Sequence, residues 1–321
     1  METVNIGGRR YSDPDILSLA RQTGGLIDPR FTIRMQARQL LDKLLSYPGV
    51  PANPLERLKI LASLNGIKIR PMNIETYQKE KRDAALYRTE VGWLLLYNPN
   101  RLARRLLFTI AHEIIHTLFP NSVTGARFRT ITNPDSREAN ELERLCDLGA
   151  AELVMPVEDF QTQANGCYTL HNLETLLGYF GTSFEATAYR MASAHPGFAV
   201  SGLLRFRHTV DQERRVRRTA EQTVLFSNLK AASSEPAEKK YRRQSLHLSD
   251  KCGDQYIIRW NKSFDSSSVV YQAHKGGVRN GFEKLPNLSN KMGRIEAVLA
   301  PYRHDAADPE FGDVIFFWEE M

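Results

Sequence analysis

Apolar side chains recur at intervals of three and four residues through much of the first third of the chain. This spacing places them on one face of an α-helix, and it occurs in residues 12–20, 31–45 and 53–64. Asp13-Pro14 and Asn53-Pro54 each supply a capping side chain followed by a Pro, which is a typical helix start. The pattern therefore predicts three amphipathic helices.

The pattern then changes to short apolar runs. Residues 67–74 are predicted as a strand, and residues 84–88 and 91–97 as an antiparallel pair joined by a tight turn. Residues 102–119 return to helical spacing without Gly or Pro, and Pro120 ends that run. This order predicts a small antiparallel sheet followed by a buried helix.

A His-Glu-x-x-His motif lies within this helix, at residues 112–116. His112 and His116 are four positions apart, so their imidazoles lie on one face, one turn apart, where two nitrogens can bind one tetrahedral Zn²⁺. Glu113 lies beside them and is placed to take a proton from the bound water rather than to bind the metal. Two incidental histidines on a buried helix are the alternative, and the neighbouring glutamate favours the metal site.

A catalytic zinc site needs a third ligand, because such sites usually have three protein ligands and a water. Residues 136–155 are predicted to form a second helix, which Pro156 ends. Glu143 and Asp147 share one face of it, so Glu143 can complete the ligand set while Asp147 accepts the second N–H of a ligand histidine. Cys146 lies on a different face from Glu143 and is predicted to be a small core residue rather than a ligand.

Four other residues are rivals for the third ligand position: Asp135, Glu138, Glu141 and His171. Glu138 and Glu141 lack an acidic residue four positions further on, and acidic residues along a helix usually form a solvated face. We therefore expect Glu143 to be the ligand.

Two segments resemble the ImmA/IrrE-type metallopeptidases. Residues 108–116, FTIAHEIIH, resemble the FTxAHExxH helix of that family, and residues 143–156 resemble its ExxCNxFAAxLLMP segment. Asp147 stands where Asn is frequent in the family and Gly149 where an aromatic residue is usual, and neither change removes a metal ligand. A weaker similarity extends over residues 53–191.

This resemblance implies a zinc endopeptidase with one Zn²⁺ per chain and a protein substrate. Relatives of this type cleave a helix-turn-helix repressor. The function expected is therefore hydrolysis of a peptide bond in such a repressor, in a stress-response, defence or mobile-element switch. The alternative is a non-proteolytic regulator that binds DNA or a repressor and whose zinc site is structural or vestigial, although a structural site has no need of Glu113.

The predicted strand pair directly precedes the histidine helix, which is the order found in zinc endopeptidases. In those enzymes an edge strand commonly holds an extended substrate by main-chain hydrogen bonds. We therefore expect the substrate cleft to be lined by Gly92, Trp93, Leu94, Leu95 and Leu96. An ordinary half-buried hairpin is the alternative.

Helical spacing continues after the second helix, in residues 157–163, 170–180 and 183–194. The last two segments, with a Gly-Thr turn between them, resemble the spacing of a helix-turn-helix. Arg190 is the only basic residue available to a recognition helix, and phosphate contacts dominate nucleic-acid affinity. We therefore favour a helical pair packed on the peptidase core over a DNA-binding pair.

Composition changes near His195, after which short candidate strands alternate with turn-forming residues. Residues 230–244 are predicted to be an exposed loop or linker. The strands are expected at residues 199–207, 245–248, 256–260, 269–273, 295–299 and 314–318. They predict a mainly β accessory domain that recognises the substrate, senses a signal or binds a partner.

The expected fold class is α+β, with a zincin-like metallopeptidase core of helices and a small antiparallel sheet. A helix-turn-helix-like segment and a mainly β accessory domain follow this core. The expected domains are an N-terminal helical extension (1–50), the metallopeptidase core (51–165), the helical segment (166–195) and the accessory domain (196–321).

Composition fits a cytoplasmic protein. Residues 1–10 contain no apolar run typical of a secretory signal, and no apolar run approaches the length of a membrane span, so no membrane contact is expected. The chain contains 3 cysteines, an odd number without a pairing pattern, which suits a reducing compartment. The net charge of +6 comes from scattered arginines, so nucleic acid is an allowed but not a favoured partner.

Overall fold

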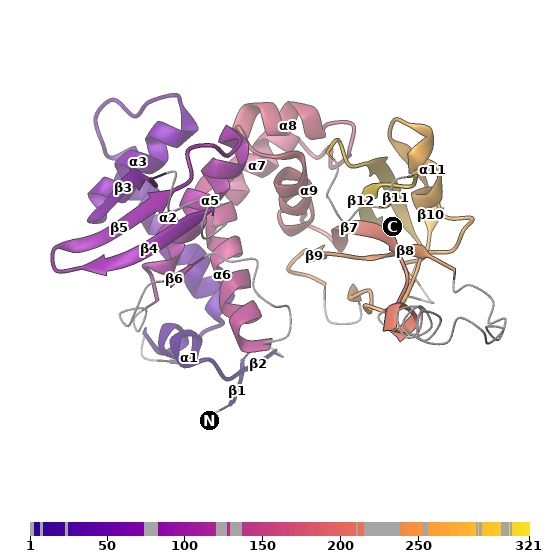
Figure 1. The fold of residues 1–321 in the computed structure, drawn as a ribbon, viewed down its shortest axis with the longest axis horizontal. Coiled ribbons are helices and arrows are strands. Elements are labelled where there is room, and N and C mark those ends of the chain that lie inside the picture. Colours follow the sequence, from indigo (N-terminus) through magenta and orange to yellow (C-terminus); the bar gives the residue numbers. More distant parts are fainter. Residues whose placement is uncertain are drawn as a thin grey trace, which may run out of the picture. The chain divides into compact units, whose positions relative to one another are not determined.

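A computed structural model of the protein shows a mixed α+β fold, as predicted (Figure 1). The chain divides into two compact units: unit 1 comprises Met1–Asp159 and Gly178–Ser183, and unit 2 comprises Phe160–Leu177 and Phe184–Met321. The structure describes residues 3–6, 9–22, 25–73, 83–119, 127–128, 137–209, 211–214, 238–252, 256–286, 288, 291–302, 308 and 310–321.

Three capped helices and a short hairpin begin unit 1. The hairpin consists of β1 (Val4–Ile6) and β2 (Arg9–Tyr11). The helices are α1 (Pro14–Arg21), α2 (Pro29–Leu45) and α3 (Pro54–Leu64), as the sequence pattern predicted. Each starts with a Pro that follows a residue whose side chain accepts hydrogen bonds from the first backbone N–H groups: Asp13, Asp28 and Asn53.

The sheet of unit 1 has the strand order β3-β5-β4-β6. Its strands are β3 (Ile67–Pro71), β4 (Ala84–Thr89), β5 (Gly92–Tyr97) and β6 (Arg127–Phe128). The predicted antiparallel pair of β4 and β5 is confirmed, and β3 runs parallel to β5. The sheet is therefore mixed rather than purely antiparallel.

The interior position of β5 corrects one expectation. We expected residues 92–96 to form an edge strand that holds substrate, but β5 is hydrogen-bonded on both sides, to β3 and to β4. Its main-chain groups are therefore taken by the sheet. Gly92 has a structural role instead: its φ is +137°, and a Cβ there would lie 2.6 Å from the carbonyl oxygen of Gly66. Contact of the side chains of β5 with a substrate remains a prediction.

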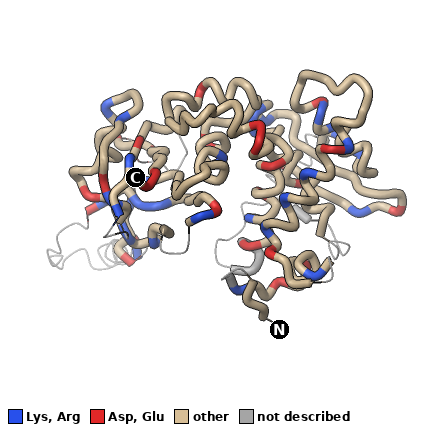
Figure 2. Tube along the Cα trace, turned by 180° about the vertical axis from the view of Figure 1, so that it is seen from behind, with Lys and Arg blue, Asp and Glu red and all other residues tan. Residues whose placement is uncertain are grey.

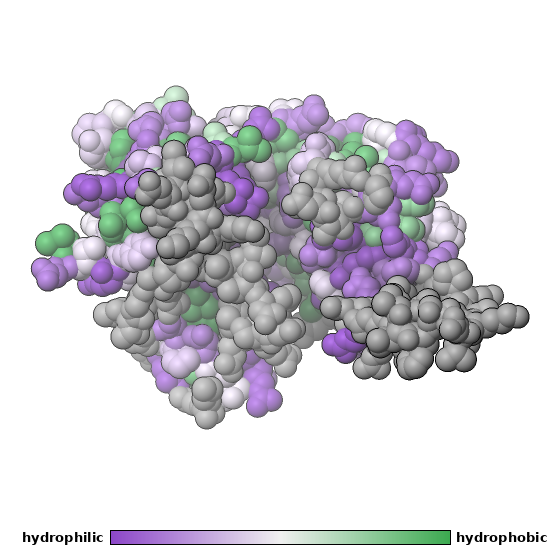
Figure 3. All heavy atoms as spheres, viewed as in Figure 1, coloured by the Kyte–Doolittle hydropathy of each residue, from purple (hydrophilic) through white to green (hydrophobic). Residues whose placement is uncertain are grey.

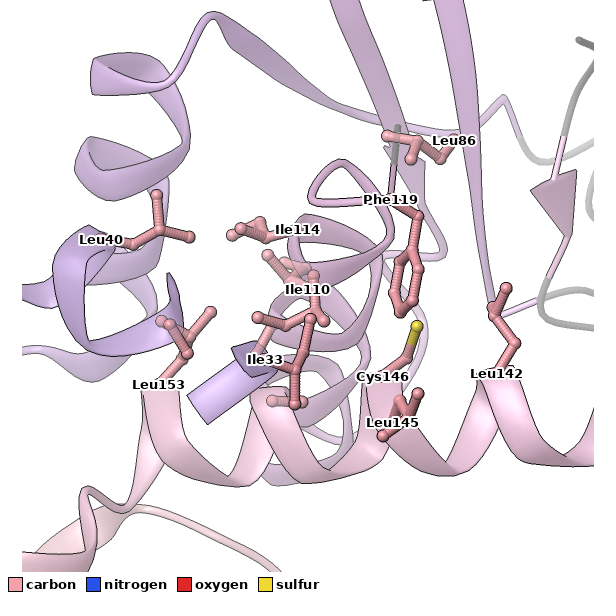
Figure 4. Close-up of a cluster of buried hydrophobic side chains, with 14 of the residues drawn as sticks. Ile33, Leu40, Leu86, Ile110, Ile114, Phe119, Leu142, Leu145, Cys146 and Leu153 are labelled. Carbon is pink, nitrogen blue, oxygen red and sulfur yellow. The ribbon is translucent and has the colours of Figure 1, made fainter. Parts of the chain in front are cut away.

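The core of unit 1 surrounds α5 (Ala103–His116), which is followed by α6 (Arg137–Val154) and α7 (Val157–Ala164). Buried side chains from α2, α5 and α6 meet in this core (Figure 4). They include Ile33, Leu40, Ile110, Ile114, Leu142, Leu145 and Leu153. Side chains of α2 contribute to this core, and Met1–Asp159 fall in the same compact unit; the expected domain boundaries stay a prediction.

Gly149 allows α5 and α6 to approach closely. A Cβ built on Gly149 would lie 2.9 Å from the Cγ1, Cγ2 and Cδ1 atoms of Ile115. The whole Ile115 side chain thus occupies the space that a larger residue at position 149 would need.

We predict that Gly149→Ala lowers the free energy of unfolding by about 1 kcal/mol. Overpacking against Ile115 costs about 1–3 kcal/mol and outweighs the gain of about 1 kcal/mol in helix propensity. In an Ile115→Ala background the clash is absent, so the same substitution should stabilise by about 1 kcal/mol. Urea unfolding of the four proteins of this cycle measures the change of sign, and an equal effect in both backgrounds would contradict the packing argument.

Unit 2 is built on an antiparallel sheet, and its mainly β character is confirmed. The strand order is β10-β11-β12-β7-β8, and β9 also pairs with β7. The strands are β7 (Ala199–Arg207), β8 (Lys240–Arg243), β9 (His247–Leu248), β10 (Arg279–Glu283), β11 (Gly293–Leu299) and β12 (Asp313–Glu320). Buried aromatic and aliphatic side chains, among them Tyr241, Phe316 and Trp318, form its core.

Three segments of unit 2 differ from the predictions. Residues 269–273 form the short helix α11 (Val269–Gln272) and the start of η2 (Ala273–Lys275), because the Ser268 hydroxyl caps the N–H of Val270. Residues 256–260 bury Tyr256 and Ile258 without joining the sheet. The predicted linker contains β8, where a single buried tyrosine lies among basic residues that made the segment look exposed.

The helix-turn-helix-like pair consists of α8 (Leu173–Phe180) and α9 (Phe184–Ser193). Arg190, the one basic residue available for DNA contact, is only 1% exposed. A guanidinium buried to this extent cannot reach a phosphate backbone. This burial supports the interpretation of a packed helical pair.

Charged residues are spread over the described parts of both units, with acidic and basic positions interspersed (Figure 2). Where Figure 3 colours the surface by hydropathy, most of it is hydrophilic, with separate hydrophobic areas. Within the ranges that the structure describes, no helix is both long and apolar enough to cross a membrane.

Candidate metal centre

The buried helix α5 presents the motif histidines. His112 is 1% exposed, His116 is 3% exposed and Glu113 is fully buried. Apolar residues on either side of the motif, such as Ile110 and Ile114, are fully buried as well. The hydrophobic sequence of α5 thus places two imidazoles and a carboxylate inside the protein, where each polar atom needs a partner.

Helix α6 supplies the carboxylates that meet these imidazoles. Nε2 of His112 lies 3.0 Å from Oε2 of Glu143, and Nε2 of His116 lies 3.5 Å from Oε1 of the same residue. The two Nε2 atoms are 3.1 Å apart. On its other side, Nδ1 of His112 lies 2.8 Å from Oδ1 of Asp147. The structure therefore brings together the four residues predicted to form the metal site and its hydrogen-bond support.

The separations match those expected around one zinc ion. Tetrahedral zinc with ligand bonds of about 2.0–2.2 Å places neighbouring ligand atoms about 3.3 Å apart. The three separations between His112, His116 and Glu143 are 3.1, 3.0 and 3.5 Å. These three residues can therefore hold a zinc ion with little rearrangement.

The direction of the hydrogen bonds also favours a cation at this position. Asp147 accepts at Nδ1 of His112, which favours the tautomer with the proton on Nδ1 and leaves a lone pair on Nε2. That lone pair points at a carboxylate oxygen of Glu143 and at Nε2 of His116. Electron-rich atoms at such distances repel one another unless a cation or a proton lies between them.

Cys146 has a position that the sequence analysis did not foresee. Its sulfur lies 3.4 Å from Nδ1 of His116, and it also points toward the ring of Phe119 (Figure 4). We expected Cys146 to be only a small core residue. It is fully buried, but it also contacts the second nitrogen of His116 as Asp147 contacts that of His112. Cys146 directly precedes Asp147 on α6. This adjacency was the signal in the sequence that could have indicated a contact of each residue with one of the two histidines.

His112, His116 and Cys146 also form a buried group of side chains whose possible ligand atoms all lie within 4.8 Å of one another. Cys146 contacts Nδ1 of His116, however, whereas His112 and Glu143 approach Nε2. These nitrogens lie on different edges of the ring and point in different directions. A metal at Nε2 would therefore be bound by Glu143 rather than by Cys146.

The rival third ligands do not join this group in the described part of the chain. Asp135 and the side chain of Glu138 lie outside the described residues. His171 is exposed in unit 2. Glu141 lies on α6, two positions before Glu143 and so on a different face of the helix.

Comparison with known proteins supports a peptidase-type fold. Residues 62–192 match the model of the peptidase M78 family, described as the IrrE N-terminal-like domain. No curated protein matches the sequence. Among solved structures, a Mycobacterium tuberculosis transcriptional regulator has a similar fold, with a TM-score of 0.54 and 13% sequence identity over 90% of this chain and 76% of that chain.

At 13% identity the likeness to the regulator shows a shared fold and nothing about function. The family match is more informative, because residues 62–192 contain the whole of α5 and α6 and therefore every residue of the candidate site. The match over residues 62–192 is with the IrrE N-terminal-like domain of M78 peptidases, in agreement with the resemblance to ImmA/IrrE-type enzymes.

Proposed function

We propose that this protein is a zinc-dependent endopeptidase whose metal ligands are His112, His116 and Glu143. The observation that carries the proposal is the convergence of three ligand atoms from α5 and α6 at separations of 3.0–3.5 Å. The family match supports a metallopeptidase in general. The proposal goes beyond the family match in three respects: the ligand set, one zinc per chain and a metal site of the HExxH…ExxxD type.

Zinc bound at this site would make water a stronger nucleophile and polarise the carbonyl of the scissile bond. Glu113 then acts as the general base: its carboxylate accepts the proton of the attacking water and donates it to the nitrogen of the leaving amine. Glu113 is fully buried beside His112, so bulk water does not screen its carboxylate. In this role Glu113 moves protons and does not bind the metal.

Asp147 and Cys146 orient the two histidines. By accepting a hydrogen bond from Nδ1, each keeps Nε2 of its histidine unprotonated and directed toward the metal position. A carboxylate is a stronger acceptor than a thiol. Asp147 should therefore contribute more than Cys146 to the metal affinity of the site.

The side chain of Glu143 is 42% exposed and that of Asp147 is 40% exposed, whereas the histidines are buried. The α6 side of the site is therefore open to solvent, and we expect a peptide to approach from there. Following the resemblance to ImmA/IrrE-type enzymes, the proposed substrate is a cytoplasmic helix-turn-helix repressor in a stress-response, defence or mobile-element switch.

We predict that purified protein contains about one zinc per chain, as a single His₂Glu site requires. Glu143→Ala should lose most of this zinc, because it removes one of three ligands. Cys146→Ala should retain it, because the thiol supports His116 without binding the metal. Elemental analysis after purification without added metal measures both, and zinc loss in Cys146→Ala with retention in Glu143→Ala would assign the third ligand to the cysteine.

Asp147→Asn should weaken zinc binding about 10- to 100-fold, because a neutral amide is a poorer acceptor for the Nδ1 proton of His112. Asp159→Asn is the matched control, since it removes the same charge at an exposed position on α7. Competition with a chromophoric zinc chelator measures the affinity. Equal zinc affinity in Asp147→Asn and wild type would show that this hydrogen bond has no role in metal binding.

Glu113→Gln should keep zinc and fold but lose proteolysis, with a rate at least about 100-fold lower, because the amide cannot accept a proton. Zinc-loaded wild type and variant are incubated with a bacterial cell extract, and new protein N-termini are identified by mass spectrometry. Termini that appear only with wild type are expected. If both proteins produce the same termini, Glu113 is not the base; if neither does and both contain zinc, the non-proteolytic regulator is favoured.

A further inference from the structure

Unit 2 contains a group of basic side chains around an aromatic ring, which we call the arginine–tryptophan cluster: Arg207, Arg242, Arg243 and Trp260. The guanidinium of Arg207 lies 4.1 Å from the centre of the Trp260 ring, and that of Arg243 lies 5.5 Å from it. Trp260 is 37% exposed, so the ring is accessible from outside. Arg259 and Lys262, on either side of it in sequence, are exposed.

The position of the cluster follows from the sheet. Strand β8 is the last strand in the order of unit 2, and it pairs with β7 through Arg242 opposite Arg205 and Lys240 opposite Arg207. The chain near Trp260 runs along the outer side of β8, where Ser263 forms a bridge with Arg242. Basic residues from three segments are thus gathered at one edge of the sheet, and Figure 2 shows Lys and Arg positions concentrated in this part of unit 2.

The arginines of the cluster are held by backbone and ring contacts. Arg242 is 6% exposed and donates from Nε to the carbonyl of Arg207 at 3.3 Å and from a terminal nitrogen to that of Asn261 at 2.6 Å. Arg207 donates to the carbonyl of Arg243 at 3.0 Å. Within the described part of the chain, neither Arg207 nor Arg242 forms an ion pair with a carboxylate. Two partly or fully buried positive charges therefore lack a directly bound counter-ion there.

Other basic residues of unit 2 have a carboxylate that offsets their charge. Arg205 pairs with Asp313 at 2.8 Å, Lys291 with Glu320 at 2.6 Å and Lys239 with Asp308 at 2.9 Å. Arg207 and Arg242 differ from these pairs, because carbonyl oxygens face both guanidinium groups and the Trp260 ring faces that of Arg207.

The positive charges near Arg207 affect the pKa of its guanidinium group. Burial lowers the pKa of this guanidinium, and the neighbouring charges of Arg205, Arg242 and Arg243 lower it further, whereas Glu213 opposes them. Like charges this close repel one another unless an anion offsets them. The cluster is therefore arranged to gain from binding a negatively charged group.

We propose that the arginine–tryptophan cluster is a binding site for the phosphate group of a nucleotide, either free or within a single strand of nucleic acid. Guanidinium groups offer paired N–H donors that match phosphate oxygens, and stacking on Trp260 holds two of them in place. The exposed part of the Trp260 ring offers a surface on which a base can stack. This combination of basic groups and an aromatic ring favours a nucleotide over an acidic peptide. The proposal does not depend on the metallopeptidase function.

The test is binding of a fluorescein-labelled single-stranded oligothymidylate of ~12 nucleotides to the full chain, measured by fluorescence anisotropy at several salt concentrations. Arg207→Ala/Arg243→Ala should weaken binding at least about tenfold and reduce the slope of log Kd against log salt by about 1.4, or ~0.7 for each lost phosphate contact. Trp260→Ala should weaken binding roughly tenfold through loss of stacking.

The matched control is Lys275→Ala/Lys284→Ala, which removes two exposed charges elsewhere in unit 2 and should change Kd less than about twofold, since it removes no phosphate contact. Thermal unfolding checks the fold of each variant, and Arg207→Gln/Arg243→Gln, which keeps the side-chain length, replaces the alanine pair if that pair unfolds. Competition by free thymidine monophosphate indicates a free nucleotide as the source of the phosphate, and competition by unlabelled oligonucleotide alone indicates a strand.

Three results would overturn the proposal. The first is absence of binding by the wild type at low salt. The second is an equal loss of affinity in the lysine control and the arginine pair, which would show attraction by net charge alone. The third is displacement of the oligonucleotide by polyglutamate of equal charge as efficiently as by unlabelled oligonucleotide, which would assign the cluster to an acidic protein partner.

Discussion

The close packing of α5 against α6 is the constraint on which the rest of unit 1 depends. Two histidines on α5 can share a metal with a carboxylate only if α6 approaches to within one layer of side chains. Gly149 permits this approach, since the side chain of Ile115 fills the space beside it. In the family that the sequence resembles, an aromatic residue is usual at this position, so here an isoleucine from the opposite helix takes up part of that volume.

The same packing distributes the polar partners of the histidines. Successive positions on α6, Cys146 and Asp147, reach the Nδ1 atoms of His116 and His112, and Glu143, one turn earlier, reaches both Nε2 atoms. One helix thus supplies both the proposed third ligand and the groups that orient the other two. A buried imidazole without such a partner would be costly, which explains why acidic and thiol side chains of α6 face the two histidines.

Unit 2 illustrates two ways of placing arginine near a protein interior. Arg205 is matched by Asp313 in a paired and hydrogen-bonded arrangement, whereas Arg207 and Arg242 rely on carbonyl oxygens and the Trp260 ring. The first arrangement offsets the charge of Arg205 within the sheet. The second leaves positive charge available to an external anion, which is why the cluster is more informative about binding than the net charge of +6.

Local signals in the sequence were sufficient to predict the helices of unit 1, the β4–β5 hairpin and the meeting of His112, His116, Glu143 and Asp147. Capping residues, prolines and a spacing of four positions act within one helical turn, so no long-range information is needed. Tertiary structure decided what depends on neighbours distant in sequence: β3 covers one edge of β5, α2 joins the core, Cys146 contacts His116 and Val269–Gln272 is helical. These features depend on which surfaces meet after folding, and the periodicity of a single segment carries no record of its partner.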